Sequence, residues 1–366
     1  GGRLEVTSLA NGGLNSSIGA SSADPANLRL ESGTLAYIGG SDAVSDRGIT
    51  LVNGGAERAI QVDGGRIVEF SGLVTSPDDA GLTKAGWGTL ILSNAANDYV
   101  GITTITGGGG SQNSTLSVNT LSNGGVVSGI GAATNASTNL VMSDGGRLQY
   151  TGGTVAIDRG FTLASGNGGI NVAQAGTTLT VSGVAAGAGT FVKDGDGTLI
   201  LSGANSYTGD TIVNAGILRA GSAQAFGPGG RYMTVNSGGT LDLGGFDIWV
   251  GALIGTGSVS LGSNTLTSAG GPGVFSGAIT GSGGFTRGAG SYTQTISGCG
   301  NDYTGVTTVS GGLNIDCIAN GGQASSIGAS GAASGNLVLD GNWLSYAGGS
   351  VTTDRGFTAT SRGAYI

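Results

Sequence analysis

Hydrophobic and polar residues alternate along this chain over very short stretches. In TLILS (89–93), TTITG (103–107), DTIVN (210–214) and GILRAG (216–221), aliphatic or β-branched residues alternate between flanking Gly, Asn, Asp and Ser. This pattern is typical of β-strands of about four to six residues bounded by turns. No segment keeps a helical period over the length of a helix, so the sequence predicts an all-β fold.

A much longer pattern is repeated along the same chain. Residues 4–51, 116–163 and 313–359 are close copies that share NGG, IGA and DRG triplets, and residues 218–251 are a divergent copy. The copies start at positions 4, 116, 218 and 313, in steps of 112, 102 and 95 residues. We therefore interpret 1–366 as a single continuous domain of repeated units, 1–108, 109–216, 217–312 and a truncated 313–366.

Strands this short need neighbours stacked above and below them. The chain has 79 Gly but only 4 Pro in 366 residues, which favours many tight turns over a collagen-like or disordered chain. Coils of about 20 to 25 residues, each with three short strands stacked in parallel, account for the spacing of the turns. The sequence thus predicts a parallel β-helix, a three-stranded solenoid, with ladders of Leu, Ile and Val inside and Thr, Ser and Asn outside.

The charge balance limits the classes of partner. The net charge is −8 and the pI is about 4.4, which argues against nucleic acid and disfavours anionic lipid or sulfated glycans. No apolar run has the length of a membrane helix, so we expect this segment not to be inserted in a membrane. Because it opens on Gly1 without a signal peptide and stops at Ile366 within a repeated pattern, we expect a fragment of a longer protein.

A twelve-residue motif closes each of the first three units. It reads NDYVGITTITGG (97–108), NSYTGDTIVNAG (205–216) and NDYTGVTTVSGG (301–312), within segments at about 82–108, 191–221 and 285–316. The first segment has Lys84, Gly88, Thr89, Leu90, Tyr99 and Gly101; the second has Lys193, Gly197, Thr198, Leu199, Tyr207 and Gly209; the third keeps Tyr303 and Gly305.

These segments resemble the passenger-associated transport repeat, also called the autotransporter-associated β-strand repeat, of Gram-negative autotransporters. The third departs from the pattern, since Arg287 replaces the Lys and SYTQTIS (291–297) replaces the apolar strand. The resemblance implies a right-handed parallel β-helix passenger, exported by a C-terminal translocator barrel that we expect outside this segment. Such passengers are anchored in the outer membrane, displayed at the cell surface, and usually act as adhesins or virulence factors.

The repeated tyrosines, glycines and DRG triplets are interpreted as structural. Tyr99, Tyr207 and Tyr303 are expected to pack over a turn at which Gly101, Gly209 and Gly305 let the backbone bend. The DRG triplets are Asp46–Arg47–Gly48, Asp158–Arg159–Gly160 and Asp354–Arg355–Gly356. We predict a turn closed by the Asp side chain, with the Gly in a left-handed conformation.

Cys299 and Cys317 are the two cysteines of the chain, and 18 residues separate them. This separation is close to one coil, so the two side chains are candidates for a disulfide between adjacent coils, which an exported protein permits. Two free thiols are the alternative.

Catalytic chemistry has little support in the sequence. The chain has no His, which excludes a Ser–His–Asp triad. Polysaccharide cleavage by carboxylates is the remaining enzyme class, with candidate pairs Asp78/Asp79, Asp194/Asp196 and Asp242/Asp247, but we interpret these as turn residues. The DGDG string at 194–197 lacks the other acidic ligands of a calcium loop. We therefore predict no catalytic, cofactor-binding or metal-binding residues.

The leading hypothesis is a surface-displayed, non-catalytic adhesin segment. It would attach to a host cell-surface or extracellular-matrix protein, or to other copies of itself. The alternative is a structural spacer that promotes export, with binding elsewhere, and the second alternative is a polysaccharide-degrading β-helix enzyme. No ligand-binding residue is identified, although Trp87, Trp249 and Trp343 do not repeat; exposed aromatic side chains are favoured at interfaces. A binding site is better sought where the copies differ.

Overall fold

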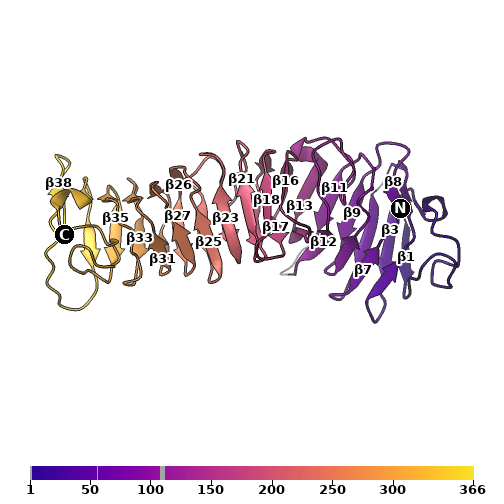
Figure 1. The fold of residues 1–366 in the computed structure, drawn as a ribbon, viewed down its shortest axis with the longest axis horizontal. Coiled ribbons are helices and arrows are strands. Elements are labelled where there is room, and N and C mark those ends of the chain that lie inside the picture. Colours follow the sequence, from indigo (N-terminus) through magenta and orange to yellow (C-terminus); the bar gives the residue numbers. More distant parts are fainter. Residues whose placement is uncertain (1, 56, 108–111) are drawn as a thin grey trace. The chain divides into compact units, whose positions relative to one another are not determined.

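The computed structural model describes residues 2–55, 57–107 and 112–366. The chain packs as two compact units, 1–197 and 198–366, and each is described by itself. Figure 1 shows short strands stacked side by side within each unit. The predicted boundaries of the repeated units, and their continuity over 1–366, stay predictions.

Three stacks of parallel strands make up the first unit. The first stack contains β1 (Gly2–Val6), β3 (Gly33–Tyr37), β6 (Arg58–Val62), β9 (Leu82–Ala85), β11 (Thr103–Thr106), β13 (Leu140–Ser143), β16 (Phe161–Leu163) and β19 (Ala185–Gly187). The second contains β4 (Ala43–Ser45), β7 (Ile67–Phe70), β10 (Thr89–Leu92), β12 (Ser114–Val118), β14 (Gly146–Tyr150), β17 (Asn167–Val172) and β20 (Thr190–Asp194). The third side is formed by β2 (Arg29–Leu30), β5 (Ile49–Leu51) and β8 (Val74–Thr75), and further on by β15 (Val155–Ile157) and β18 (Thr178–Val181).

The second unit repeats this arrangement. One stack contains β22 (Thr211–Val213), β24 (Tyr232–Val235), β27 (Ala252–Gly255), β30 (Gly273–Phe275), β33 (Thr293–Ile296), β35 (Gly312–Ile315) and β37 (Leu344–Tyr346). Another contains β21 (Thr198–Leu201), β23 (Gly216–Ala220), β25 (Gly239–Asp242), β28 (Ser258–Ser260) and β31 (Ala278–Thr280). The last contains β26 (Ile248–Val250), β29 (Leu266–Ser268), β32 (Phe285–Arg287), β34 (Thr307–Val309), β36 (Leu337–Leu339) and β38 (Thr358–Ala359). The predicted all-β parallel solenoid with three strands per coil is confirmed.

Inward residues on neighbouring strands form continuous ladders, as the alternation predicts. On β11, Thr103 and Ile105 are buried while Thr104 and Thr106 are partly exposed. Ile105 lies in register with Met142 of β13, which in turn lies in register with Leu163 of β16. Each short strand thereby buries its apolar side chains against the coils before and after it.

Coil length departs from the prediction at three places. Many register steps fall near the expected value, such as 25 residues from Gly33 to Arg58 and 19 from Thr293 to Gly312, but Ile105 to Met142 takes 37. Loops between strands fill the difference, at 7–28, 119–139 and 316–336, and each ends in a 3₁₀ turn. These turns are η1 (Pro25–Asn27), η2 (Ser137–Asn139) and η3 (Ser334–Asn336). We refer to the three segments as the long loops.

Within the described ranges, the 3₁₀ turns are the only helical elements. No helix in those ranges has the length and hydropathy of a membrane span.

Candidate functional site

The Arg of each DRG triplet is inserted into the long loop that precedes it in the chain. Arg159 donates to the carbonyl oxygens of Ser122 (2.8 Å), Val126 (2.9 Å) and Gly131 (2.9 Å). Arg47 and Arg355 make the equivalent bonds, to Ala10, Leu14, Gly19 and the Ser21 hydroxyl in one loop, and to Ala319, Gln323, Gly328 and the Ser330 hydroxyl in the other. The guanidinium fork thus supplies hydrogen-bond donors to carbonyl groups along the loop backbone.

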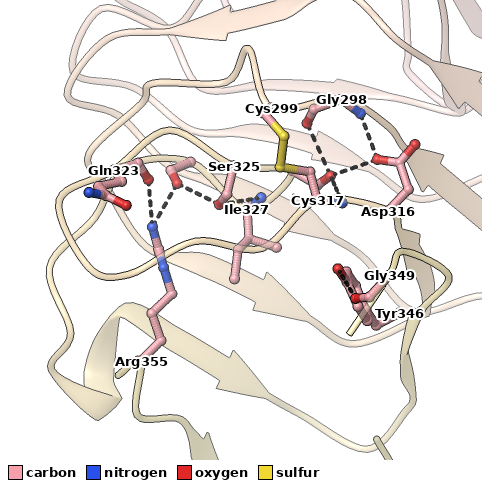
Figure 2. The surroundings of a disulfide bond; sticks show 12 residues. Gly298, Cys299, Asp316, Cys317, Gln323, Ser325, Ile327, Tyr346, Gly349 and Arg355 are labelled. Carbon is pink, nitrogen blue, oxygen red and sulfur yellow. Dashed lines mark hydrogen bonds between the residues drawn. A yellow bond between two sulfur atoms is a disulfide. The ribbon is translucent and has the colours of Figure 1, made fainter. Parts of the chain in front are cut away.

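Burial has an electrostatic effect on this arginine. Removal from water lowers the pKa of Arg159, while the nearby Tyr99 and Asp158 act in the opposite direction. The equivalent pKa of Arg355 is lowered for the same reason. Figure 2 shows the Arg355 side chain directed into the third long loop, toward Gln323.

The Asp of each triplet fixes the loop as well. Asp158 Oδ1 accepts from the Gly124 backbone N–H (2.7 Å), and the Asp158 N–H donates to the Asn123 side chain (3.0 Å). Asp46 makes the same pair of bonds with Gly12 and Asn11, and Asp354 makes them with Gly321 and Asn320. The DRG and NGG triplets, more than 30 positions apart in each copy, are therefore two halves of one clamp.

The prediction that the glycine of the DRG triplet has a left-handed conformation is wrong. Gly48, Gly160 and Gly356 are not among the glycines with positive φ. Glycine is needed for space instead, since a Cβ on Gly48 would lie 2.5 Å from Pro25 Cγ and 2.8 Å from the Leu73 carbonyl oxygen. The prediction of a turn closed by the Asp side chain also missed the main contact, which is with the long loop.

The tyrosines of the twelve-residue motif lie inside the solenoid rather than over a turn. Tyr99, Tyr207 and Tyr303 are at most 1% exposed. Each hydroxyl shares a hydrogen bond with the threonine four positions later, at 2.9, 2.7 and 2.7 Å. Burial raises the pKa of Tyr99 to about 12 and raises those of Tyr207 and Tyr303 further.

The asparagine that opens the motif is also buried. Asn97 Oδ1 accepts from the Val74 N–H (2.8 Å), and Asn301 Oδ1 accepts from the Ile279 N–H (2.9 Å). Both bonds cross from one coil to the one before it. The motif therefore holds neighbouring coils together through a buried amide and a buried phenol.

The motif glycines lie at bends, as the sequence predicts. Gly101, Gly209 and Gly305 are all at bends, and none has a positive φ. A Cβ on Gly101 would collide with the backbone of Ala80, and one on Gly305 would collide with the backbone of Gly283. Close approach of two coils therefore requires glycine at these two positions.

A cation occupies an inward ladder position in each copy. Lys84 lies in register between Ile60 and Ile105 and is fully buried. Its ammonium donates to the carbonyl oxygens of Ala85 (2.7 Å) and Gly86 (2.8 Å) and to the Ser114 hydroxyl (3.0 Å). Desolvation lowers the pKa of Lys84 to about 7.

The other two copies place a cation in the same way. Lys193 is in register with Ile170, and its ammonium donates to the carbonyl oxygens of Asp194 and Gly195. Desolvation lowers its pKa to about 8. In the third copy Arg287 donates to the Ser268 carbonyl oxygen (2.6 Å), so the Lys-to-Arg replacement keeps a buried cation.

The two cysteines form a disulfide. Cys299 and Cys317 are joined with their Cα atoms 5.4 Å apart (Figure 2). Next to the bond, Asp316 Oδ1 accepts from the Gly298 N–H (2.7 Å), and the Ser326 hydroxyl donates to the Gly298 carbonyl oxygen (3.1 Å). The disulfide therefore lies at the base of the third long loop.

Carboxylates that are candidates for catalysis make structural bonds. Asp194 accepts from Arg147 Nε (2.8 Å) and Asp242 from Arg219 Nε (2.8 Å). Asp247 accepts from the Thr265 N–H (2.7 Å), and Asp78 accepts from the N–H groups of Asn53 and Ala80, which lower its pKa. In the described part of the chain, no three His, Cys, Asp or Glu side chains come together as a metal site would require.

An open groove lies in the second compact unit, 198–366. Its volume is about 480 Å³, and Asp210, Arg231, Tyr232, Gly271 and Tyr292 contribute to its walls. Tyr232 is 37% exposed and Tyr292 is 56% exposed. Trp249 is 53% exposed and packs on Gly229. The next residue, Gly230, also contributes to the groove wall. Trp87 and Trp343 are also exposed.

Three segments of the chain match the model of a known protein family. The family model of the passenger-associated-transport-repeat matches residues 82–109, 191–220 and 289–313. The chain carries this repeat three times. The buried asparagines and tyrosines described above lie within these matches, as do Lys84 and Lys193, whereas Arg287 lies two residues before the third match.

The similarity also extends beyond the transport repeats. Over 362 residues, 98% of its length, the chain is 60% identical to the adhesin BmaC autotransporter of Brucella suis biovar 1 (strain 1330). The chain spans only 10% of that relative. No solved structure matches the chain.

Sequence reasoning missed the groove. Arg231, Tyr232 and Tyr292 have no counterparts in the transport-repeat pattern, and Tyr232 lies in the divergent copy, 218–251. Of the nine tyrosines, six recur at equivalent positions of the copies, whereas Tyr232 and Tyr292 have no repeat partner. This difference is the signal in the sequence that could have pointed to the groove.

Proposed function

We propose that this chain is a non-catalytic adhesive segment of an autotransporter passenger, displayed at the cell surface and anchored through the rest of the protein in the outer membrane. The identity of 60% over nearly the whole chain to a relative named as an adhesin autotransporter carries the proposal. The three transport repeats support the export route. Its partner would be a host cell-surface or extracellular-matrix component, or a second copy of the protein.

A spacer is the second candidate, and one observation favours it. The recurring cation, asparagine and tyrosine of the transport repeats, such as Lys84, Asn97 and Tyr99, are buried in all three copies. Residues inside a solenoid maintain its length and order but do not touch a partner. These buried positions alone therefore support a stalk, and adhesion would depend on exposed side chains.

Deletion of whole repeats separates the two functions. Removing 116–217 or 218–312 from the full-length displayed protein joins equivalent positions, so the remaining copies stay in phase. An adhesive segment predicts that at least one deletion reduces attachment of bacteria to host cells several-fold. The spacer function predicts equal attachment for both deletions and for the parent, with surface display of each checked by antibody labelling.

A further inference from the structure

The aromatic side chains of the groove differ in exposure from the tyrosines of the twelve-residue motif. Tyr99, Tyr207 and Tyr303 are buried, whereas Tyr232 and Tyr292 present more than a third of their surface to solvent. Both line the groove of the second unit. Exposed aromatic side chains around a hollow are typical of recognition sites, because they offer a large apolar face at low entropic cost.

The position of Tyr232 is fixed by its surroundings. Its backbone N–H donates to Asp210 Oδ1 (3.1 Å), and a Cβ on Gly271 would collide with its ring. The ring therefore packs against bare backbone of a later coil. A face held in this way loses little freedom when a ligand packs against it.

The polar wall residues carry opposite charges. Arg231 supplies N–H donors only, and Asp210 supplies carboxylate acceptors. Together they suit a ligand with hydroxyl groups, which both donate and accept. A strongly acidic ligand would meet the Asp210 carboxylate and a chain of net charge −8, so this combination favours a neutral ligand.

We propose that this groove binds a neutral pyranose unit of a glycan. The C–H face of the sugar ring packs on Tyr232 or Tyr292, and its hydroxyls bond to Asp210 and Arg231. The volume of about 480 Å³ has room for one or two sugar rings. The inference rests on the proposed adhesive function and specifies the partner of this segment as a carbohydrate.

Binding of the purified chain to neutral and acidic oligosaccharides tests the inference. The probes are hexose and N-acetylhexosamine disaccharides, and the same disaccharides carrying sialic acid or sulfate. We expect binding to a neutral probe, with affinity at least tenfold weaker in Tyr292→Ala and in Arg231→Ala. Tyr365→Ala removes a tyrosine that is 69% exposed in the same unit outside the groove, and should bind within twofold of the parent.

Three results would overturn the inference: no binding to any neutral probe, preference for the acidic probes, or parental affinity in both groove variants. Unfolding curves of each variant show whether a loss of binding reflects the groove or the fold. Attachment of bacteria displaying the full-length protein is measured in parallel. If they attach to host cells equally well with Tyr292→Ala, and after periodate oxidation of the cell glycans, the glycan inference fails while the adhesive function stands.

Discussion

Arg159 Nη2 donates to the Gly131 carbonyl oxygen over 2.9 Å, although 28 residues separate them. The same guanidinium holds the backbone of the long loop at several further points along its length. One side chain therefore organises a loop of some twenty residues, 119–139, that has no strand of its own. The first and third long loops depend on Arg47 and Arg355 in the same way.

Replacing this arginine should destabilise the first unit. Arg159→Ala removes the donor to the Ser122 and Val126 carbonyl groups, and we expect the free energy of unfolding to fall by about 3 kcal/mol. Chemical denaturation measures the change. Arg29→Ala is the control, because Arg29 is exposed and pairs with the exposed Glu31, and such pairs contribute about 1 kcal/mol or less. Equal losses in the two variants would contradict the clamp.

The buried tyrosines predict a loss of stability in alkali. The pKa of Tyr99 is raised to about 12, against about 10 in an unfolded chain. The unfolded state therefore loses the proton first, and the stability that is fully present below pH 10 is lost as the pH rises toward 12. Each such phenol contributes a slope of about 1.4 kcal/mol per pH unit in that range.

Tyr99→Phe isolates the contribution of one phenol. At neutral pH the variant should be about 1 kcal/mol less stable, since the bond to the Thr103 hydroxyl is lost. Between pH 9 and 11 its unfolding free energy should fall less steeply than that of the parent chain. Identical pH profiles would show that the Tyr99 hydroxyl does not remain protonated in the folded state.

Local pattern and long-range contact explain what the sequence could and could not predict. The alternation at 103–106 identified a strand, because the side-chain period of a strand is visible within four residues. The repeats then identified the solenoid. The sequence does not predict the inward position of Lys84, because a charged side chain is expected to be exposed unless its hydrogen-bond acceptors are known. One of these acceptors, Ser114, lies 30 residues further on.

The DRG clamp was missed for the same reason. The sequence contains the DRG and NGG triplets as separate repeated motifs, and it does not show that Asp158 contacts Gly124. The groove depends on the relation between three coils, since Asp210, Gly271 and Tyr292 come from different ones. Such surfaces follow from the stacking, which a pattern of single strands does not specify.

Glycine at a close approach between coils predicts a matched pair of variants. In Gly101→Ala the added methyl group would collide with the backbone of Ala80, so we expect a loss of about 2 kcal/mol or more. Gly153→Ala adds the same group where no atom lies within 4 Å and φ is not positive, so its stability should be unchanged or slightly higher. Thermal unfolding of the two variants compares these effects. A stable Gly101→Ala protein would mean that the coils can separate at this point without cost.

The disulfide should stabilise the third long loop in particular. It joins residues 18 apart, and closing a loop of this size contributes about 3 kcal/mol. We expect the double variant Cys299→Ser/Cys317→Ser to unfold at lower denaturant concentration than the parent and to be insensitive to reductant. Intact mass before and after reduction tests the bond, which predicts a gain of two hydrogen atoms. Two thiols that titrate in the unreduced protein would contradict it.

The part of the chain that loses stability on reduction distinguishes the effect of this disulfide from that of a general crosslink. Cys317 is the second residue of the loop, 316–336, and the Ser326 hydroxyl further along the loop bonds to Gly298 beside Cys299. The second long loop, 119–139, has the DRG clamp but no cysteine. Reduction should therefore speed amide hydrogen exchange in 316–336 and leave 119–139 unchanged. Because Arg355 still holds the third loop by its own bonds, exchange there should increase without reaching the rate of an unfolded chain.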